Sequence, residues 1–307
     1  MQVKDGIIGL LIGDALGVPV EFKSREYLKE SPVTEMIGGG IHGQDPGTWS
    51  DDTSMTMATM ASIINKKAID YTDIMEEFYD WHSNDAYCQY YRFDIGFTTS
   101  NALEKYSQGI PALECGGKGD RTNGNGSLMR ILPLAYIPNI DYETIENVSA
   151  LTHAHERSKI ACVLYVEIAK SMIENKELSI DEHIKQSCDK IKGHYKDSEE
   201  LKHFKRIFDD DLNDVDTISG KGYVISTFES VIHCLKTTGN YKDAVLKAVN
   251  LGEDTDTVAA ICGGLAGIYY GYDAIPIDWI NAVPQIDTVL SLCEKYEEFC
   301  DEYQRNY

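Results

Sequence analysis

Apolar residues recur at helical spacing along most of this sequence, and this periodicity limits the fold more than any other feature. Within 224–235 they are spaced four, three and four residues apart, and similar stripes occur within 160–172 and 74–81. Residues at such spacing share one face of an α-helix, whereas the alternation typical of a half-buried β-strand is scarce. The sequence therefore predicts an all-α fold.

No Pro/Gly/Ser-rich linker, low-complexity tract or internal repeat divides the chain, so residues 1–307 are interpreted as one compact multi-helix domain. Segment 259–271 interleaves large apolar residues with Ala and Gly, which predicts a central, buried helix that a neighbouring helix approaches closely. Two glycine-rich segments, 23–48 and 108–125, are expected to form long loops. The charged run 185–214 is expected to form a solvated pair of surface helices.

The formal net charge of −22 argues against nucleic acid or an anionic membrane as a partner, because both would be repelled. The eight cysteines are scattered without a C-x-x-C pair and are interpreted as free thiols in a reducing compartment. The apolar run 7–20 has no basic segment before it and is not interpreted as a signal peptide; segment 258–270 is too short to cross a bilayer. We expect a soluble, cytoplasmic monomer.

Two acidic pairs stand about 200 residues apart, each at the start of a helical pattern. They are Asp51 with Asp52, and Asp254 with Asp256. Either pair alone could simply cap a helix, since Asp is a usual residue there. Paired divalent cations, however, need carboxylates from more than one segment, and both pairs are flanked by hydroxyl side chains. The combination favours a two-metal centre at helix N-termini.

Six short motifs occur in the order seen in ADP-ribosylglycohydrolases, and they extend over nearly the whole chain. They are GDALGVPVE at 13–21, WSDDT at 49–53, DIG at 94–96, GNGSLMR at 124–130, HAH at 153–155 and GEDTDT at 252–257. Singly the glycine motifs are weak, but the ordered set is specific. The chain resembles bacterial members of this family, of the dinitrogenase-reductase-activating glycohydrolase type.

The resemblance implies a metal-dependent hydrolase that removes ADP-ribose from a modified protein side chain by cleaving the ribosyl bond. ADP-ribosylated protein or ADP-ribose is the implied partner, and two Mg²⁺ or Mn²⁺ ions are the implied cofactors. Cleavage passes through an oxocarbenium-like state, so orientation of the ribose and stabilisation of charge carry most of the effect. The family positions that coordinate the ions correspond here to Ser50, Asp51, Asp52, Asp254, Asp256 and Thr257.

Two further carboxylates take catalytic positions by resemblance. Glu21 corresponds to an acidic residue on a mobile loop that can bind a metal or act as an acid or base at the scissile bond. Asp94 corresponds to a carboxylate near the leaving group, where it could pair with a guanidinium. That pairing favours arginine-linked over serine-linked ADP-ribose. Asp14 either makes a polar contact between helices or supports the metal site.

The substrate-binding positions come from three motifs. Gly124, Asn125, Gly126 and Ser127 form a loop whose N–H groups could cradle the diphosphate, although a bare turn would look the same. By resemblance the match extends to Met129, His153 approaches the ADP-ribose, and Tyr223 packs against the ligand or else is an ordinary core tyrosine at a helix start. Arg130 is expected to pair with a buried carboxylate.

The sequence also leaves other functions to be weighed. A non-catalytic relative, serving as an ADP-ribose or nucleotide-binding module or as a crystallin, would have lost metal ligands, and all six are present. An isoprenoid synthase would need D-D-x-x-D, but Met55 occupies the fifth position. A phosphohydrolase of the His-Asp kind would need an adjacent His-Asp dyad, and the sequence contains none. Two departures from the family, Ser50 for a frequent Thr and Glu253 for a frequent Gly, remove no ligand.

Overall fold

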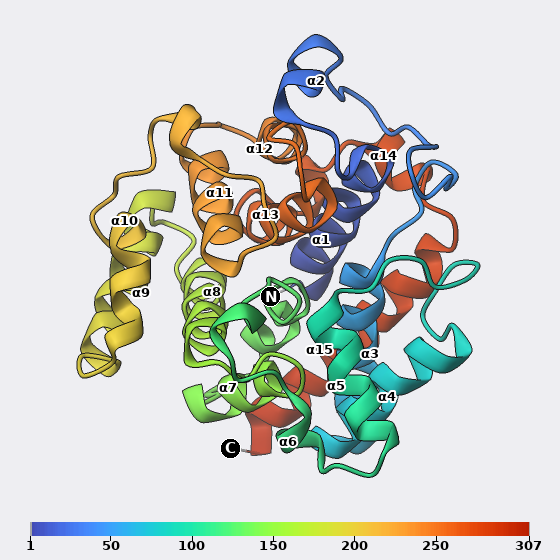
Figure 1. Cartoon of the computed structure of the whole chain (residues 1–307), viewed down its shortest axis with the longest axis vertical. Coiled ribbons are helices and arrows are strands. Elements are labelled where there is room, and N and C mark those ends of the chain that lie inside the picture. Colours follow the sequence, from blue (N-terminus) through green and yellow to red (C-terminus); the bar gives the residue numbers. More distant parts are fainter. Residues whose placement is uncertain (1, 307) are drawn as a thin grey trace.

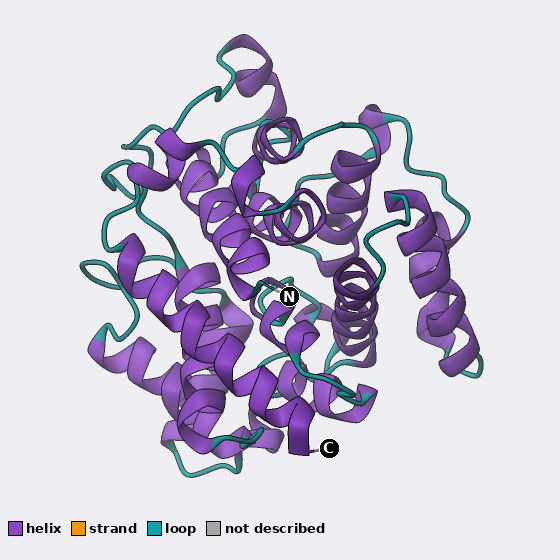
Figure 2. Cartoon of the chain, turned by 180° about the vertical axis from the view of Figure 1, so that it is seen from behind, coloured by secondary structure: helices purple, strands orange, loops and turns teal. Residues whose placement is uncertain are grey.

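The computed structural model describes residues 2–306, and every regular element in that range is helical (Figures 1 and 2). This confirms the predicted all-α class. The α-helices are α1 (Val3–Gly17), α2 (Arg25–Glu30), α3 (Asp51–Lys66), α4 (Tyr71–Asn84), α5 (Phe97–Ser107), α6 (Ala112–Cys115), α7 (Tyr142–Ala150), α8 (Glu156–Glu174), α9 (Ile180–His194), α10 (Lys205–Phe208), α11 (Val224–Lys236), α12 (Tyr241–Val249), α13 (Thr255–Tyr270), α14 (Ile277–Asn281) and α15 (Ile286–Asn306). The 3₁₀ turns are η1 (Val18–Val20), η2 (Asp120–Thr122), η3 (Leu128–Arg130), η4 (Leu132–Tyr136), η5 (Glu199–Phe204), η6 (Val215–Thr217) and η7 (Tyr272–Ala274).

Helices α1 and α13 form the central pair of the fold, although they come from opposite ends of the chain (Figure 1). Glycines let the two backbones touch. A methyl group on Gly13 would lie 2.0 Å from the carbonyl oxygen of Ala259, and one on Gly9 would lie 2.3 Å from that of Gly263. The predicted central helix with a small-residue face is therefore confirmed. This contact brings the C-terminal end of α1 to the N-terminal end of α13.

The expected loops are mostly irregular, with short helices inside them. Segment 23–48 contains α2, and segment 108–125 contains α6 and η2. The prediction for the charged run 185–214 is partly wrong: α9 ends at His194, and a 3₁₀ turn and the short α10 follow it. Phe204 and Ile207 from these turns are buried in the core. The sequence did not indicate this burial, because the apolar residues of the run are few and are separated by charged residues.

The cysteines are free thiols, as predicted, and seven of the eight are buried. Among residues 2–306 no helix combines the length and the apolar character that crossing a bilayer requires. The cytoplasmic location, the monomeric state and the extent of the domain over 1–307 stay predictions.

Candidate metal centre and substrate cleft

The two acidic motifs meet where α3 and α13 begin. Ser50 is the N-cap of α3, and its hydroxyl donates to Oδ2 of Asp52 at 3.0 Å. Thr257, in the first turn of α13, donates its hydroxyl to the same oxygen at 3.2 Å. Asp254 is the N-cap of α13, and Asp256 lies in its first turn. The hydroxyl-flanked carboxylates that the sequence places about 200 residues apart thus share one site.

Asp14 fixes the start of α3 from the neighbouring helix. Its carboxylate accepts hydrogen bonds from the Ser50 and Thr53 backbone N–H groups and, at 2.6 Å, from the Thr53 hydroxyl. Burial raises the pKa of Asp14 to about 6, although these hydrogen bonds oppose the shift. Oxygens of Asp14, Asp52 and Asp256 lie within 4.8 Å of one another. Both roles left open for Asp14 fit this geometry, because it joins α1 to the start of α3 and lies beside the acidic site.

Several buried carboxylate oxygens of the site have no hydrogen-bond partner. These are Oδ1 of Asp52 and both oxygens of Asp256, and no Lys or Arg of residues 2–306 forms an ion pair with either residue. Burial and, after it, the neighbouring carboxylates raise the pKa of both residues well above its usual range. Buried charge without compensation is strongly unfavourable. A set of oxygen donors in this state fits hard divalent cations such as Mg²⁺ and Mn²⁺.

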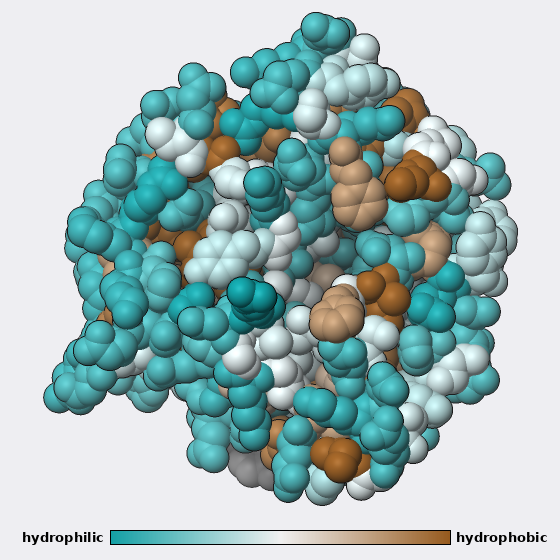
Figure 3. All heavy atoms as spheres, in the orientation of Figure 1, coloured by the Kyte–Doolittle hydropathy of each residue, from teal (hydrophilic) through white to brown (hydrophobic). Residues whose placement is uncertain are grey.

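A cleft of about 540 Å³ opens above these helix N-termini. In the orientation of Figure 1 the surface is mostly hydrophilic, and a hollow lies near the centre of this face (Figure 3). The cleft has the size of a small-molecule site. Its walls bring together most of the residues predicted from the sequence: Glu21, Asp51, Asp94, Gly124, Asn125, Gly126, Met129, His153, Asp254 and Thr257.

The two candidate catalytic carboxylates face each other in this cleft. Glu21 directly follows η1, and its side chain is buried. Burial and the nearby Asp94 raise the pKa of Glu21 to about 9, so in the metal-free protein this carboxyl carries a proton at neutral pH. Asp94 is half-buried and has a φ of 54°, a backbone conformation that Asp tolerates better than most residues. Burial raises its pKa as well.

The glycine loop is fixed to the carboxylates by Asn125. Its amide Nδ2 donates to Oδ2 of Asp254 at 2.7 Å and to the hydroxyl of Thr227 at 3.0 Å. Backbone hydrogen bonds join the loop to the start of α11, from Asn125 N–H to the Gly222 carbonyl and from Val224 N–H to the Asn123 carbonyl. The loop is therefore held in place before any ligand binds.

His153 lies under this loop, so close that Gly126 has no room for a side chain. A methyl group on Gly126 would lie 2.9 Å from Cε1 of His153, and one on Gly124 would lie 3.5 Å from its Nε2. Burial, with a smaller effect of Arg130, lowers the pKa of His153 to about 3. The imidazole is thus neutral at physiological pH, and its Nδ1 pairs with the Thr152 hydroxyl at 2.8 Å.

With this geometry established, comparison with known proteins identifies the family. The family model described as ADP-ribosylglycohydrolase matches residues 2–306. The chain belongs to the ADP-ribosylglycohydrolase family. It is 32% identical to the ADP-ribosylarginine hydrolase Tri1 of Serratia proteamaculans, over 96% of this chain and 78% of that protein. It is 29% identical to the ADP-ribosyl-[dinitrogen reductase] glycohydrolase of Rhodospirillum rubrum, over 93% and 94% of the two chains.

The fold agrees with this membership. A solved chain described as an ADP-ribosylglycohydrolase-related protein complex has a TM-score of 0.81 and 26% identity to this one, over 97% of this chain and 98% of that chain. The resemblance inferred from the ordered motifs is confirmed. Because the relatives are named as hydrolases, the predicted enzyme class is confirmed as well.

Three predicted residues of this glycohydrolase lie in positions that the sequence did not indicate. The Ser127 hydroxyl points into the core, where it accepts from the hydroxyl of Ser149 at 2.9 Å. Tyr223 is 36% exposed at the N-cap of α11, so it is not a core tyrosine, and its hydroxyl accepts from Arg157. The expectation for Arg130 is wrong: its guanidinium has no carboxylate partner among residues 2–306.

Arg130 instead contacts neutral groups, and its buried Nε and Nη1 have no hydrogen-bond partner. Its Nη2 donates to the Val148 carbonyl and the Thr152 hydroxyl, and its guanidinium lies 4.4 Å from the centre of the Phe78 ring. Burial lowers the pKa of Arg130 to about 10. A carbonyl, a hydroxyl and an aromatic face leave no trace in a sequence pattern, which explains the error.

Sequence reasoning missed three residues at the glycohydrolase cleft. His42 contacts Glu21, with 2.5 Å between Nε2 and Oε2. Arg121 and Lys221 line the cleft and are the two basic side chains among its lining residues. Two of them could have been found from their position in the sequence. Arg121 lies three residues before Gly124, and Lys221 lies two residues before Tyr223.

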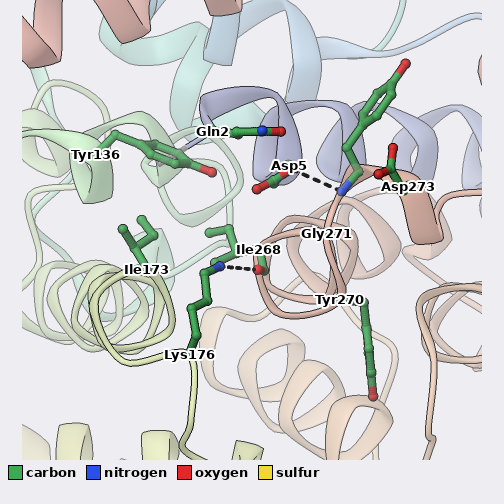
Figure 4. A pocket seen from close by; sticks show the side chains of 10 residues that line it. Gln2, Asp5, Tyr136, Ile173, Lys176, Ile268, Tyr270, Gly271 and Asp273 are labelled. Atoms are coloured by element: carbon green, nitrogen blue, oxygen red, sulfur yellow. Dashed lines mark hydrogen bonds between the residues drawn. The ribbon is translucent and has the colours of Figure 1, made fainter.

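A second cavity, of about 350 Å³, lies at the opposite end of the α1 and α13 pair (Figure 4). Its main charged groups are already paired. Asp5 accepts from the Tyr272 N–H at 3.0 Å, and the Lys176 ammonium donates to the Ile268 carbonyl at 3.1 Å. No unpartnered buried carboxylate of the described residues lies in this cavity, in contrast to the cleft above α3 and α13.

Proposed function

We propose that this protein is a metal-dependent hydrolase that releases ADP-ribose from modified arginine side chains of proteins. One observation carries the proposal. Two hydroxyl-flanked acidic motifs converge below a cleft of suitable size, and carboxylate oxygens of Asp52 and Asp256 are buried there without partners. The names of the relatives from Serratia and Rhodospirillum support the reaction class.

The residues that would hold two Mg²⁺ or Mn²⁺ ions are oxygen donors from both helix starts. They are Ser50, Asp51, Asp52, Asp254, Asp256 and Thr257. Bound ions would orient the ribose hydroxyls and a water beside the anomeric carbon, and would invert the negative field that otherwise repels a diphosphate. The chain itself contributes rigidity, because Asp14 and Asn125 fix the positions of α3 and of Asp254.

The glycine loop would hold the diphosphate. Gly124 and Gly126 carry no side chain, so their backbone can approach a ligand closely. The neutral His153 beneath them adds no charge and can exchange hydrogen bonds with the ligand at Nε2. Arg121 and Lys221 add positive charge to a cleft wall whose other charged side chains are carboxylates.

Asp94 and Glu21 would act on the leaving group. A carboxylate at Asp94 can bind a guanidinium through two parallel hydrogen bonds, which favours arginine over serine as the modified residue. The Glu21 carboxyl would act as the general acid that passes a proton to the guanidine nitrogen as the ribosyl bond breaks. Both carboxyls line the same cleft as the glycine loop, so one substrate can reach all three.

The test is to incubate the protein with arginine-linked, serine-linked and O-acetyl ADP-ribose, in Mg²⁺ or Mn²⁺ and again in excess chelator. We expect release of ADP-ribose from the arginine-linked substrate, dependent on metal. Turnover that resists the chelator contradicts a metal-dependent reaction. Tight binding of ADP-ribose without turnover of any substrate would instead indicate a non-catalytic relative.

A further inference from the structure

A tight turn places His42 beside the cleft. The Gly39 N–H donates to the Gln44 carbonyl at 2.7 Å, and the Gln44 amide donates to the carbonyl of His42 at 3.0 Å. The turn is docked on η1, because a methyl group on Gly40 would lie 2.1 Å from the carbonyl oxygen of Pro19. His42 follows Gly40 by two residues, so the packing of Gly40 on Pro19 also fixes the backbone at His42.

The imidazole of His42 is held between two aromatic rings and against two carboxylates. The Phe93 ring centre lies 5.0 Å from that of His42, and the Phe22 ring centre lies 6.4 Å away. Nε2 of His42 is 2.5 Å from Oε2 of Glu21. One ligand atom each of Glu21, His42 and Asp94 all lie within 4.8 Å of one another.

No basic residue compensates these carboxylates. Among residues 2–306 neither Glu21 nor Asp94 forms an ion pair with Lys or Arg, and the imidazole of His42 is the side chain that contacts the Glu21 carboxyl. A contact of 2.5 Å between an imidazole nitrogen and a carboxylate oxygen requires a proton between them. The cluster therefore brings one nitrogen and two carboxyl groups together around a single point.

We propose that Glu21, His42 and Asp94 form a third cation site, adjacent to the paired centre, which takes a transition-metal ion such as Zn²⁺. The ion replaces the proton between His42 and Glu21, and that proton is released to solvent. One nitrogen and two carboxylate oxygens are the ligands of open zinc sites, where water supplies the fourth position.

The imidazole selects the metal. Mg²⁺ prefers oxygen ligands throughout, whereas imidazole nitrogen suits zinc and its neighbours. The paired centre offers oxygen donors, so His42 distinguishes the two sites chemically. Glu21 also lies within 4.8 Å of Asp254 and Asp256 at the paired centre. Zinc bound by Glu21 and His42 would occupy the Glu21 carboxylate, and under the proposed function it would inhibit the hydrolase.

The experiment compares the number of zinc ions bound per chain in wild type and variants. Binding alone is not decisive, because Zn²⁺ can also enter the paired centre. Wild-type protein in excess Mg²⁺ is dialysed against Zn²⁺, and bound zinc and magnesium are both measured. We expect His42→Leu to bind one zinc ion fewer per chain than wild type, with its magnesium content unchanged. Loss of a metal ligand should weaken that one site by more than about 100-fold, since loss of a supporting partner alone costs 10–100-fold.

Two further variants separate the site from general effects. His42→Gln keeps a hydrogen-bond donor beside Glu21 but removes the imidazole, so it should lose the same zinc ion. His203→Leu removes another imidazole near a carboxylate, 3.8 Å from Glu200, and should keep the wild-type count. Equal zinc counts in wild type and both His42 variants would overturn the proposal. Binding is read without turnover, so the result stands apart from the test of the hydrolase reaction.

Discussion

The Thr257 hydroxyl donates a hydrogen bond to Oδ2 of Asp52 over 3.2 Å, across 205 residues of sequence. Ser50 donates to the same oxygen. Both hydroxyls thus satisfy one oxygen of Asp52 and leave Oδ1 without a partner. This contact joins the start of α3 to the start of α13 and leaves one buried oxygen of Asp52 available as a ligand.

Asp256→Asn should weaken binding of Mg²⁺ or Mn²⁺ by at least about 100-fold, because the change removes a charged ligand from the centre. In excess chelator the same variant should melt at a higher temperature than wild type, because it removes buried charge that has no partner. Calorimetric titration and thermal melts measure the two effects. Asp5→Asn, in the second cavity, should leave metal affinity unchanged. Equal affinity in wild type and Asp256→Asn would exclude Asp256 as a ligand.

Asp94→Ala should slow cleavage of ADP-ribosyl-arginine by about 100-fold while leaving the affinity for free ADP-ribose nearly unchanged. Asp94 is proposed to bind the guanidinium, which free ADP-ribose lacks. A charge-assisted hydrogen bond shielded from water contributes about 1.5–3 kcal/mol, and each 1.36 kcal/mol is tenfold in rate. Initial rates and calorimetric titration give the two numbers. If the cleavage rate and the affinity for ADP-ribose fall by the same factor, Asp94 has a structural role. The proposed preference for arginine then has no support.

The sequence predicted the helices and the acidic site because both depend on local pattern and on residue type. The apolar stripes determined the helix faces, and paired carboxylates at two helix starts are rare enough to indicate a metal site. The sequence could not predict the individual side-chain contacts. The partners of Arg130 are a carbonyl, a hydroxyl and a ring, and His42 reaches Glu21 through a turn without regular structure. Such contacts depend on tertiary packing alone.

Gly13→Ala should destabilise the protein by about 1–3 kcal/mol or more, since the new methyl group would lie 2.0 Å from the carbonyl oxygen of Ala259. If α1 moves, Asp14 moves away from Ser50 and Thr53, and if α13 moves, it displaces Asp254 and Asp256, so metal affinity should fall in either case. Denaturant unfolding and calorimetric titration measure both. Gly193→Ala in α9 is the matched control: nothing lies within 4 Å of the new methyl, and the helix should gain up to about 1 kcal/mol. Equal stability of Gly13→Ala and wild type would contradict the close contact of α1 with α13.

The buried His153 should make stability depend on pH below neutrality. Its pKa is lowered from 6.5 to about 3 by burial, so between these values the unfolded chain binds a proton that the folded chain does not. Stability is therefore unaffected by this group above pH 7 and decreases as the pH falls from 6.5 toward 3. For one such histidine the loss reaches about 2 kcal/mol at pH 5.

His153→Gln removes this titration and should flatten the pH dependence. The free energy of unfolding of wild type and variant is measured from pH 8 to pH 4 in chelator, so that metal binding does not contribute. Burial also lowers the pKa of His82, His183 and His233, but these residues are common to both proteins and cancel in the difference. The two curves should run parallel above pH 7 and diverge below it, with wild type losing about 2 kcal/mol more by pH 5. Parallel curves down to pH 4 would mean that His153 reaches solvent protons in the folded state, and the loop of Gly124 and Gly126 would then be open over it.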